Sequence, residues 1–176
     1  MILVNLFGAP GAGKSTGAAY IFSQLKMRGI NAELVTEFAK DKVWEESKAV
    51  FENQAYIFGK QYFRISRCAD KVDVIITDSP LLLSLVYNKN PILGENFNNV
   101  VRDVAASYNS KNYYLTRVKP YNPAGRFQDA NESDEIGEEI LNLLIKENID
   151  FVKLSGDVNG YDEIVKDIYS QVMFYN

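Results

Sequence analysis

Histidine is absent from the sequence, and cysteine occurs once, as Cys68. The lack of histidine excludes histidine-based catalytic triads, zinc–histidine sites and histidine general bases, so acid–base chemistry falls to carboxylates. A single cysteine cannot form an intramolecular disulfide, which favours a cytoplasmic setting. No hydrophobic run reaches the length that spans a membrane, and the apolar N-terminus lacks the charged segment of a signal peptide. We therefore expect no membrane association.

The composition is that of an ordinary globular protein. Of 176 residues, 47% are hydrophobic and 24% are charged, with a net charge of −4. This length suits one domain, residues 1–176, with a sizeable core. The slightly acidic balance gives no global basic field to attract nucleic acid, although a local basic patch would be sufficient.

One stretch, Gly8–Ser15 (GAPGAGKS), fits the phosphate-loop pattern G-x-x-x-x-G-K-[ST]. An apolar run of strand type precedes it at 2–7, and a helical pattern comes after it over 14–28. In this context, loop N–H groups and a helix N-terminus bind phosphates. The predicted nucleotide-binding residues are Gly8, Gly11, Ala12, Gly13, Lys14, Ser15 and Thr16. Lys14 would reach the β- and γ-phosphates, and the Ser15 hydroxyl would bind Mg²⁺. The alternative is a simple glycine turn between a strand and a helix.

Strand and helix patterns alternate along the chain. Strands are predicted at 2–7, 31–36, 72–77, 112–116 and 150–154, and helices at 14–28, 44–69, 81–86, 95–109, 133–147 and 161–174. The stretch 44–69 fits one or two helices. Such alternation predicts a parallel sheet with helices on both faces, which is a three-layer α/β/α domain.

Asp78 comes directly after the most apolar predicted strand, at the edge where ligands bind in parallel sheets. A carboxylate there would orient Mg²⁺ opposite Ser15. The alternative is that Asp78 caps the next helix, as Asp-Ser-Pro does well. Motor and transport ATPases usually carry a glutamate beside this aspartate, whereas this chain has Ser79. Transfer to a bound hydroxyl is thus favoured over hydrolysis.

Glu37 lies just past the second predicted strand and is the leading candidate to bind or deprotonate an acceptor hydroxyl, with Asp41 one helical turn further on. A solvated loop carboxylate is the alternative. Gln54 and Gln61 are seven residues apart and share a helix face with Arg64 nearby. These side chains would bind the acceptor, or they would form an exposed polar stripe.

Residues 117–131 form a long predicted loop that carries Arg117, Lys119 and Arg126. We interpret it as a lid whose arginines stabilise the charge of a transferring phosphoryl group and exclude water.

Two further patterns lie on the predicted helical stretch before the third strand. The cations Lys60, Arg64, Arg67 and Lys71 fit either a patch for a phosphate backbone or a solvated helix face. The aromatic residues Tyr56, Phe58, Tyr62 and Phe63 would pack the helix against the sheet, or would stack on a base.

Together, GAPGAGKS, the strand-ending Asp78-Ser79-Pro80 and the predicted arginine lid resemble the nucleotide and nucleoside kinase group of P-loop proteins. The resemblance covers nearly the whole chain and is specific at the loop. It implies a five-stranded parallel sheet of order 2-3-1-4-5, ATP as donor and Mg²⁺ as cofactor. It also implies an acceptor bound between the ends of the second and third strands and the helical stretch.

Within that group, VTEFAKD, the glutamine-bearing helix, TDSP and PYNPAGRFQ are similar to phage-type ATP-binding proteins akin to nicotinamide riboside kinase domains. Some relatives of these phosphorylate 5-hydroxymethyluracil in DNA. Deoxynucleoside kinases usually carry an acidic-Arg-Ser motif where this chain has Asp78-Ser79-Pro80, which sets it apart from them.

The sequence therefore predicts a Mg-ATP-dependent kinase that acts on a hydroxyl of a nucleoside, a nucleotide or a nucleic-acid base, as a monomer or a homodimer. Lys14, Glu37, Asp78 and Arg126 are the predicted catalytic residues, and Arg117 would contact the nucleotide. The alternative hypothesis is a regulatory P-loop NTPase or ATP-binding switch that acts on a protein partner.

Overall fold

The computed structural model describes residues 1–39, 50, 53–122 and 129–175. The strands are β1 (Ile2–Phe7), β2 (Ala32–Val35), β3 (Val74–Thr77), β4 (Ser110–Thr116) and β5 (Val152–Ser155). The described helices are α1 (Lys14–Met27), α4 (Gln54–Ser66), α5 (Leu83–Tyr87), α6 (Gly94–Ala106), α7 (Ala130–Lys146) and α8 (Val158–Tyr175). All strand pairs are parallel, in the order β2-β3-β1-β4-β5. The predicted sheet and its strand order are confirmed.

The apolar composition of β1 and β3 explains their position in the sheet. Every residue of both strands is buried, as expected for parallel strands that helices cover on both faces. Pairing places Asn5 of β1 and Val35 of β2 level with Thr77 of β3. The carboxyl ends of these three strands therefore meet at one edge, which is where open parallel sheets bind ligands.

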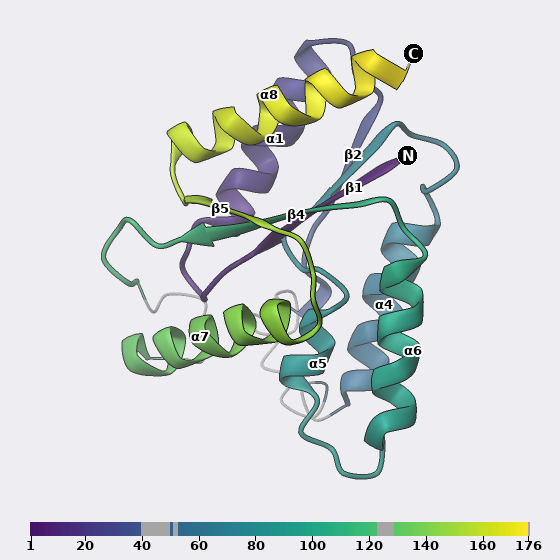
Figure 1. The fold of residues 1–176 in the computed structure, drawn as a ribbon, viewed down its shortest axis with the longest axis vertical. Coiled ribbons are helices and arrows are strands. Elements are labelled where there is room, and N and C mark those ends of the chain that lie inside the picture. The colour runs from purple at the N-terminus through teal and green to yellow at the C-terminus, as the bar shows by residue number, and fades with distance from the viewer. Residues whose placement is uncertain (40–49, 51–52, 123–128, 176) are drawn as a thin grey trace.

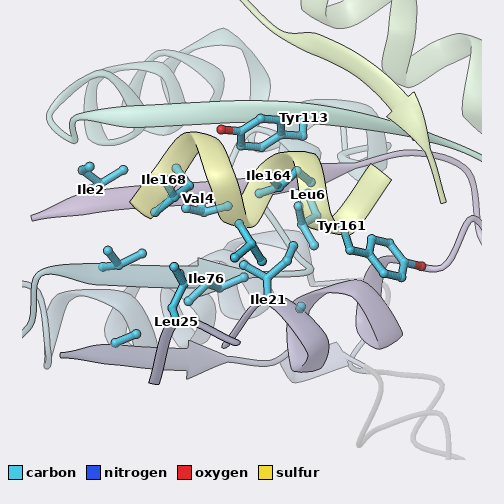
Figure 2. Packing of buried hydrophobic residues seen from close by; sticks show 14 of the residues in the cluster. Ile2, Val4, Leu6, Ile21, Leu25, Ile76, Tyr113, Tyr161, Ile164 and Ile168 are labelled. Atoms are coloured by element: carbon cyan, nitrogen blue, oxygen red, sulfur yellow. The ribbon is translucent and has the colours of Figure 1, made fainter. Parts of the chain in front are cut away.

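Helices cover both faces of the sheet, giving three layers (Figure 1). The pair α1 and α8 lies on one face, and α4, α5, α6 and α7 lie on the other. Ile21 of α1 and Ile164 of α8 are fully buried in a cluster that includes Leu6 of β1 (Figure 2). Burial of one such side chain stabilises a fold by about 1.5–3 kcal/mol. This packing fixes α1, whose first turn comes directly after the glycine-rich loop.

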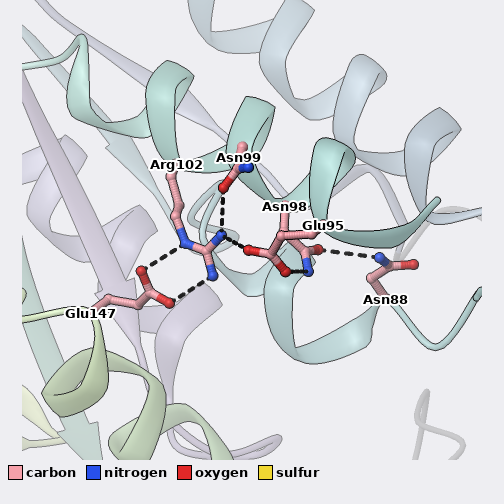
Figure 3. Close-up of polar contacts among 6 residues, drawn as sticks. All are labelled: Asn88, Glu95, Asn98, Asn99, Arg102 and Glu147. Atoms are coloured by element: carbon pink, nitrogen blue, oxygen red, sulfur yellow. Dashed lines mark hydrogen bonds and ion pairs between the residues drawn. The ribbon is translucent and has the colours of Figure 1, made fainter.

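An ion-pair cluster joins α6 to the C-terminal end of α7 (Figure 3). The Arg102 guanidinium donates to both carboxylate oxygens of Glu147, at 2.8 and 3.0 Å, and also to Glu95. These hydrogen bonds lower the pKa of Glu147 and of Glu95 below the usual glutamate value. The cluster therefore links α6 to α7 through side chains outside the sheet. Its residues are far from the glycine-rich loop in the sequence.

The prediction was wrong about the start of α7. The helix begins at Ala130 rather than Ser133, so the predicted lid at 117–131 overlaps its first residues. The N-cap of α7 is Asp129, which accepts from the Glu132 N–H, and the Glu132 carboxylate accepts from the Asp129 N–H in return. This reciprocal capping box satisfies two N–H groups that a helix N-terminus otherwise leaves unpaired.

None of the helices in the described ranges has the length and apolar character needed to cross a membrane.

Candidate active site

The glycine-rich loop leaves the carboxyl end of β1 and enters α1 directly. Gly8, Gly11 and Gly13 have φ angles of +140°, +81° and +89°. This left-handed backbone turns the chain tightly, and glycine adopts it without a steric penalty. Gly13 is the N-cap of α1, and the first turn of the helix holds no acidic residue. The partial positive charge of the helix N-terminus therefore faces the loop unopposed, which favours an anion.

The surroundings of two loop glycines leave no room for a side chain. A Cβ built on Gly8 would lie 2.5 Å from the Leu115 carbonyl oxygen of β4. A Cβ on Gly13 would lie 2.4 Å from the Tyr161 hydroxyl and 2.8 Å from the Gly156 carbonyl oxygen. The loop is therefore fitted against β4 and the β5–α8 connection, and this packing explains why both positions carry glycine.

The residues after Gly13 present their polar groups at the N-terminus of α1. The Lys14 ammonium donates to the carbonyl oxygens of Gly8 and Ala9, at 2.8 and 3.0 Å, so it lies over the loop. Ser15 and Thr16 are exposed in the first turn, where their hydroxyls are accessible. Ala12 is buried and donates its N–H to the Ala9 carbonyl within the loop. Contacts of these residues with nucleotide or Mg²⁺ stay predictions.

Asp78 comes immediately after β3 and is 3% exposed. One of its carboxylate oxygens accepts the Glu37 N–H at 2.9 Å. The alternative that Asp78 caps the next helix is wrong, because α5 begins at Leu83 and its N-cap, Leu82, makes no side-chain capping bond. Asp78 instead connects the end of β3 to the segment after β2, through its bond with the Glu37 N–H.

Glu37 is half-buried in that segment. Burial of the phenol raises the pKa of Tyr87 of α5 to about 12, and the charges of Glu37 and Glu139 add to the effect. The segment after β2 that carries Glu37 therefore lies near α5 as well as bonding to Asp78. Asp41, the other predicted acceptor residue, lies outside the described residues.

The interpretation of Gln54 and Gln61 as an exposed polar stripe is wrong. They are 5% and 4% exposed, and they share the inner face of α4 with Phe58 and Ile65. Gln54 donates to the Ser84 hydroxyl of α5 at 3.1 Å. The Gln61 amide bonds to the ends of both β2 and β3 and thereby connects them.

Arg64 lies beside these glutamines and donates to the Thr36 carbonyl oxygen at 3.1 Å. Its guanidinium also sits over the Phe38 ring, 5.2 Å from the centroid. α4 therefore contacts the residues on either side of Glu37, and acceptor binding by Gln54, Gln61 and Arg64 stays a prediction.

The aromatic residues of α4 divide between its two faces. Phe58 is buried, as predicted for packing against the sheet, but Tyr56, Tyr62 and Phe63 are 42%, 39% and 65% exposed. The prediction that all four pack inward is therefore wrong. Lys60 lies over the Tyr56 ring, 5.4 Å from its centroid, so aromatic and basic side chains share the outer face.

Arg117 lies against the glycine-rich loop, where a Cβ on Gly11 would come within 3.9 Å of its Cδ and 3.2 Å of the Tyr121 ring. The guanidinium donates to the Ser133 hydroxyl at 2.9 Å and to Asp134, and it sits over the Tyr121 ring. The described part of the predicted lid thus begins beside the phosphate loop. Arg126 lies outside the described residues.

Ser133 and Tyr161 were not predicted as site residues. Ser133 is fully buried, donates to the Pro10 carbonyl at 2.8 Å and accepts from Arg117, so it joins α7 to the loop. The Tyr161 hydroxyl shares its proton between the carbonyl oxygens of Gly13 and Gly156, each at 2.9 Å. These contacts span 123 and 148 residues to the loop, so no local pattern could reveal them.

A cavity of about 720 Å³ opens between the end of β4 and α7, next to Arg117. Its wall on α7 carries Asp134, Glu135, Glu138 and Glu139. These carboxylates disfavour a polyphosphate in this cavity, because like charges repel at short range. The phosphates of a nucleotide therefore belong on the loop side of Arg117.

The Ser15 hydroxyl and the Asp78 carboxylate are the oxygen donors that Mg²⁺ prefers. The loop before Ser15 has the positive-φ glycine turns whose backbone N–H groups bind phosphate oxygens in such sites. In the described ranges, no three cysteine or carboxylate side chains gather as a metal cluster. The residues fit a magnesium ion that binds together with a nucleotide, the usual arrangement for this metal.

Comparisons with known proteins are consistent with this arrangement. A profile of the family described as "AAA domain" matches residues 3–160. A search of curated proteins gives no match. Among solved structures, NadR protein in complex with NR is 18% identical with a TM-score of 0.70, over 96% of this chain and 50% of that chain. Deoxyadenosine kinase from M. mycoides with bound dATP is 18% identical with a TM-score of 0.60, and the match covers 96% of this chain and 99% of the kinase chain. This chain thus spans about half the length of the NadR chain. Both similarities show the predicted P-loop kinase fold.

Proposed function

Because the chain belongs to the AAA domain family, we propose that it is a Mg-ATP-dependent kinase that transfers the γ-phosphoryl group to a hydroxyl of a nucleoside or nucleotide. The observation that carries the proposal is the bond from the Glu37 N–H to Asp78 at 2.9 Å, at the edge of the sheet from which the glycine-rich loop also leaves. It ties the backbone of a candidate base to a candidate metal ligand. The two similar structures hold NR and dATP, which supports a nucleoside-type ligand.

The phosphoryl donor, ATP, would bind at the glycine-rich loop and the residues around it. Backbone N–H groups of the loop and the N-terminus of α1 hold the phosphates. Lys14, which lies over the loop, stabilises charge that builds up on the transferring group. Arg117 approaches the same loop from the start of the lid, with its Cδ near Gly11. A positioned cation at this point lowers the barrier for phosphoryl transfer.

On the acceptor side, Glu37 takes the proton of the acceptor hydroxyl. The hydroxyl oxygen forms a bond to the γ-phosphorus as the bond from that phosphorus to the bridging oxygen breaks, and ADP leaves with the bridging oxygen. Ser15 and Asp78 would hold Mg²⁺, which neutralises phosphate charge when bound. Ser79 is next to Asp78 where an ATPase carries a second carboxylate, so water lacks an evident base.

A screen with radiolabelled ATP tests the proposal. Nucleosides, nucleotides, single- and double-stranded DNA, and DNA that contains 5-hydroxymethyluracil are offered as acceptors. We expect label transfer to one of these classes, and Glu37→Gln should reduce it by about 10²–10⁴-fold with ATP binding retained. Glu33→Gln is the matched control, because Glu33 lies on β2 away from its carboxyl end. Absence of transfer to every acceptor, or full transfer by Glu37→Gln, contradicts the proposal.

A nucleic-acid acceptor is a second candidate, favoured by the outer face of α4. This face carries Tyr56, Lys60, Phe63 and Arg67 at helical spacing, and all four are exposed. Single strands bind through aromatic stacking combined with a basic track. If this candidate holds, Lys60→Glu with Arg67→Glu should weaken DNA labelling and leave labelling of a free nucleoside unchanged. Affinity for DNA should also fall steeply as salt rises.

The alternative of a regulatory switch predicts a different result. Such a protein would hydrolyse ATP without any acceptor and would respond only to a protein partner. Steady-state release of inorganic phosphate, measured with and without acceptors, separates the two functions.

A further inference from the structure

The side-chain amide of Gln61 uses both its donor and its acceptor inside the protein. Its oxygen accepts the Phe38 N–H at 3.0 Å. Its nitrogen donates to the Thr77 hydroxyl at 3.2 Å and to the Thr36 carbonyl oxygen at 3.4 Å. Gln61 is 4% exposed, so these bonds form away from water. One buried amide thereby joins α4 to the segment after β2 and to the last residue of β3.

The segment 36–38 depends on side chains for its position. The ladder between β2 and β3 ends with the pair Val35 and Thr77, so it stops before Glu37. Asp78 accepts the Glu37 N–H, and Gln61 accepts the next N–H along the chain. Two buried side chains from different elements therefore hold two consecutive backbone groups. These two hydrogen bonds fix the position of the Glu37 backbone, and therefore the point from which its side chain extends.

We propose that Gln61 is a positioning residue that sets the Glu37 carboxylate for proton removal. This inference rests on the proposed kinase function. Contact between Gln61 and the acceptor would require the amide to give up bonds to Phe38, Thr36 or Thr77. An unsatisfied buried polar group is costly, so the bonds within the protein are favoured. Under this proposal, Gln61 acts on the reaction through Glu37 instead of through direct contact with the acceptor.

The two roles give different kinetics. Loss of a positioning residue misplaces the base, and a shift of about 1 Å is enough to reduce turnover by about 10²-fold. Loss of a residue that binds the acceptor equally in the ground and transition states raises KM and leaves kcat unchanged. Phosphoryl transfer by Gln61→Met, measured with the best acceptor from the screen, separates these cases because methionine has a similar length and no amide.

We expect Gln61→Met to lower kcat for transfer by about 10–100-fold, with the KM for ATP changed less than about twofold. Hydrogen exchange of the Phe38 amide, measured on the protein without ligands, should become faster, since its acceptor is gone. Gln61→Glu keeps an acceptor for that amide and should restore part of its protection.

The matched control is Tyr113→Phe. Its hydroxyl bonds to Asp167 at 2.5 Å on the opposite face of the sheet. Loss of that bond should reduce stability and leave both kinetic constants unchanged. A raised acceptor KM with normal kcat in Gln61→Met overturns the positioning role, as does unchanged exchange at Phe38. If wild-type protein labels no acceptor, the kinase proposal fails and this inference with it. If wild type is active and Gln61→Met matches it, only this inference fails.

Discussion

Replacement of Gly13 by alanine should destabilise the protein, and the size of the effect can be worked out from its surroundings. A non-glycine residue at a φ of +89° costs about 1–2 kcal/mol. The new methyl group would lie 2.4 Å from the Tyr161 hydroxyl, so that ring must move and lose its bonds to the Gly13 and Gly156 carbonyls. The lost hydrogen bond adds about 0.5–1.5 kcal/mol. The expected total is about 1.5–3.5 kcal/mol, which lowers Tm by about 3–14 °C for a chain of this size.

Urea and thermal unfolding of four proteins measure this effect: wild type, Gly13→Ala, Tyr161→Phe and the double variant. Tyr161→Phe removes the hydroxyl that the new methyl group would strike, so the double variant should cost about 1 kcal/mol less than the sum of the two single changes. In the double variant the methyl group would still lie 2.8 Å from the Gly156 carbonyl oxygen. Removal of the Tyr161 hydroxyl should therefore relieve only part of the steric clash.

Gly59→Ala is the matched control, because a Cβ on Gly59 within α4 meets no atom within 4 Å. Alanine there should stabilise the helix by about 0.5–1 kcal/mol. The reasoning is refuted if Gly13→Ala unfolds at the wild-type temperature. Strict additivity in the double variant would refute the role of the Tyr161 hydroxyl.

Three further predictions concern other parts of the molecule. Lys14→Ala should abolish label transfer and, because it removes the donor to the Gly8 and Ala9 carbonyl oxygens, lower the free energy of unfolding by about 0.5–1.5 kcal/mol without unfolding the protein; unchanged transfer would contradict its role. Arg102→Met should cost about 1–2 kcal/mol at neutral pH. Arg102 lowers the pKa of Glu147, so the stability difference between wild type and Arg102→Met should depend on pH. The difference should be full above the usual glutamate pKa of about 4.3 and should shrink as the pH falls through the lowered pKa of Glu147. Urea titrations between pH 3 and pH 7 would measure it. Ser133→Ala should lower the free energy of unfolding in urea by about 1–3 kcal/mol, since it leaves the Pro10 carbonyl without its donor and one guanidinium nitrogen of Arg117 without its Ser133 acceptor; an unchanged midpoint would contradict the link.

The fold was predictable because its central strands are locally distinct. The β-branched run of β3 and the apolar run of β1 mark buried parallel strands, and the glycine-rich loop marks the turn from β1 into α1. The start of α7 was predicted wrongly although Asp129 and Glu132 carry the capping-box spacing. Turn-forming residues precede Asp129, so the predicted loop was continued to residue 131 and the capping-box spacing was overlooked.

The candidate site was less predictable because its connections are long-range. The spacing of Gln54, Phe58, Gln61 and Ile65 marks one helical face, yet sequence alone favours solvent for glutamine. Only the packed structure shows that the Gln61 amide has partners on β3 and just after β2. Tyr161 and Ser133 contact the glycine-rich loop across more than half of the chain, so the site depends on topology as much as on its motif.

The glycine-rich loop is synthesised before the residues that surround it in the folded protein. Gly8 packs on Leu115 of β4, and Gly13 packs on Gly156 and Tyr161. During translation, a chain that stops short of α8 would carry the complete motif but lack the wall that shapes it. Nucleotide binding should therefore arise only when residue 161 has left the ribosome. ATP would then bind only chains in which Tyr161 has reached the loop, and would stabilise only these chains against proteolysis.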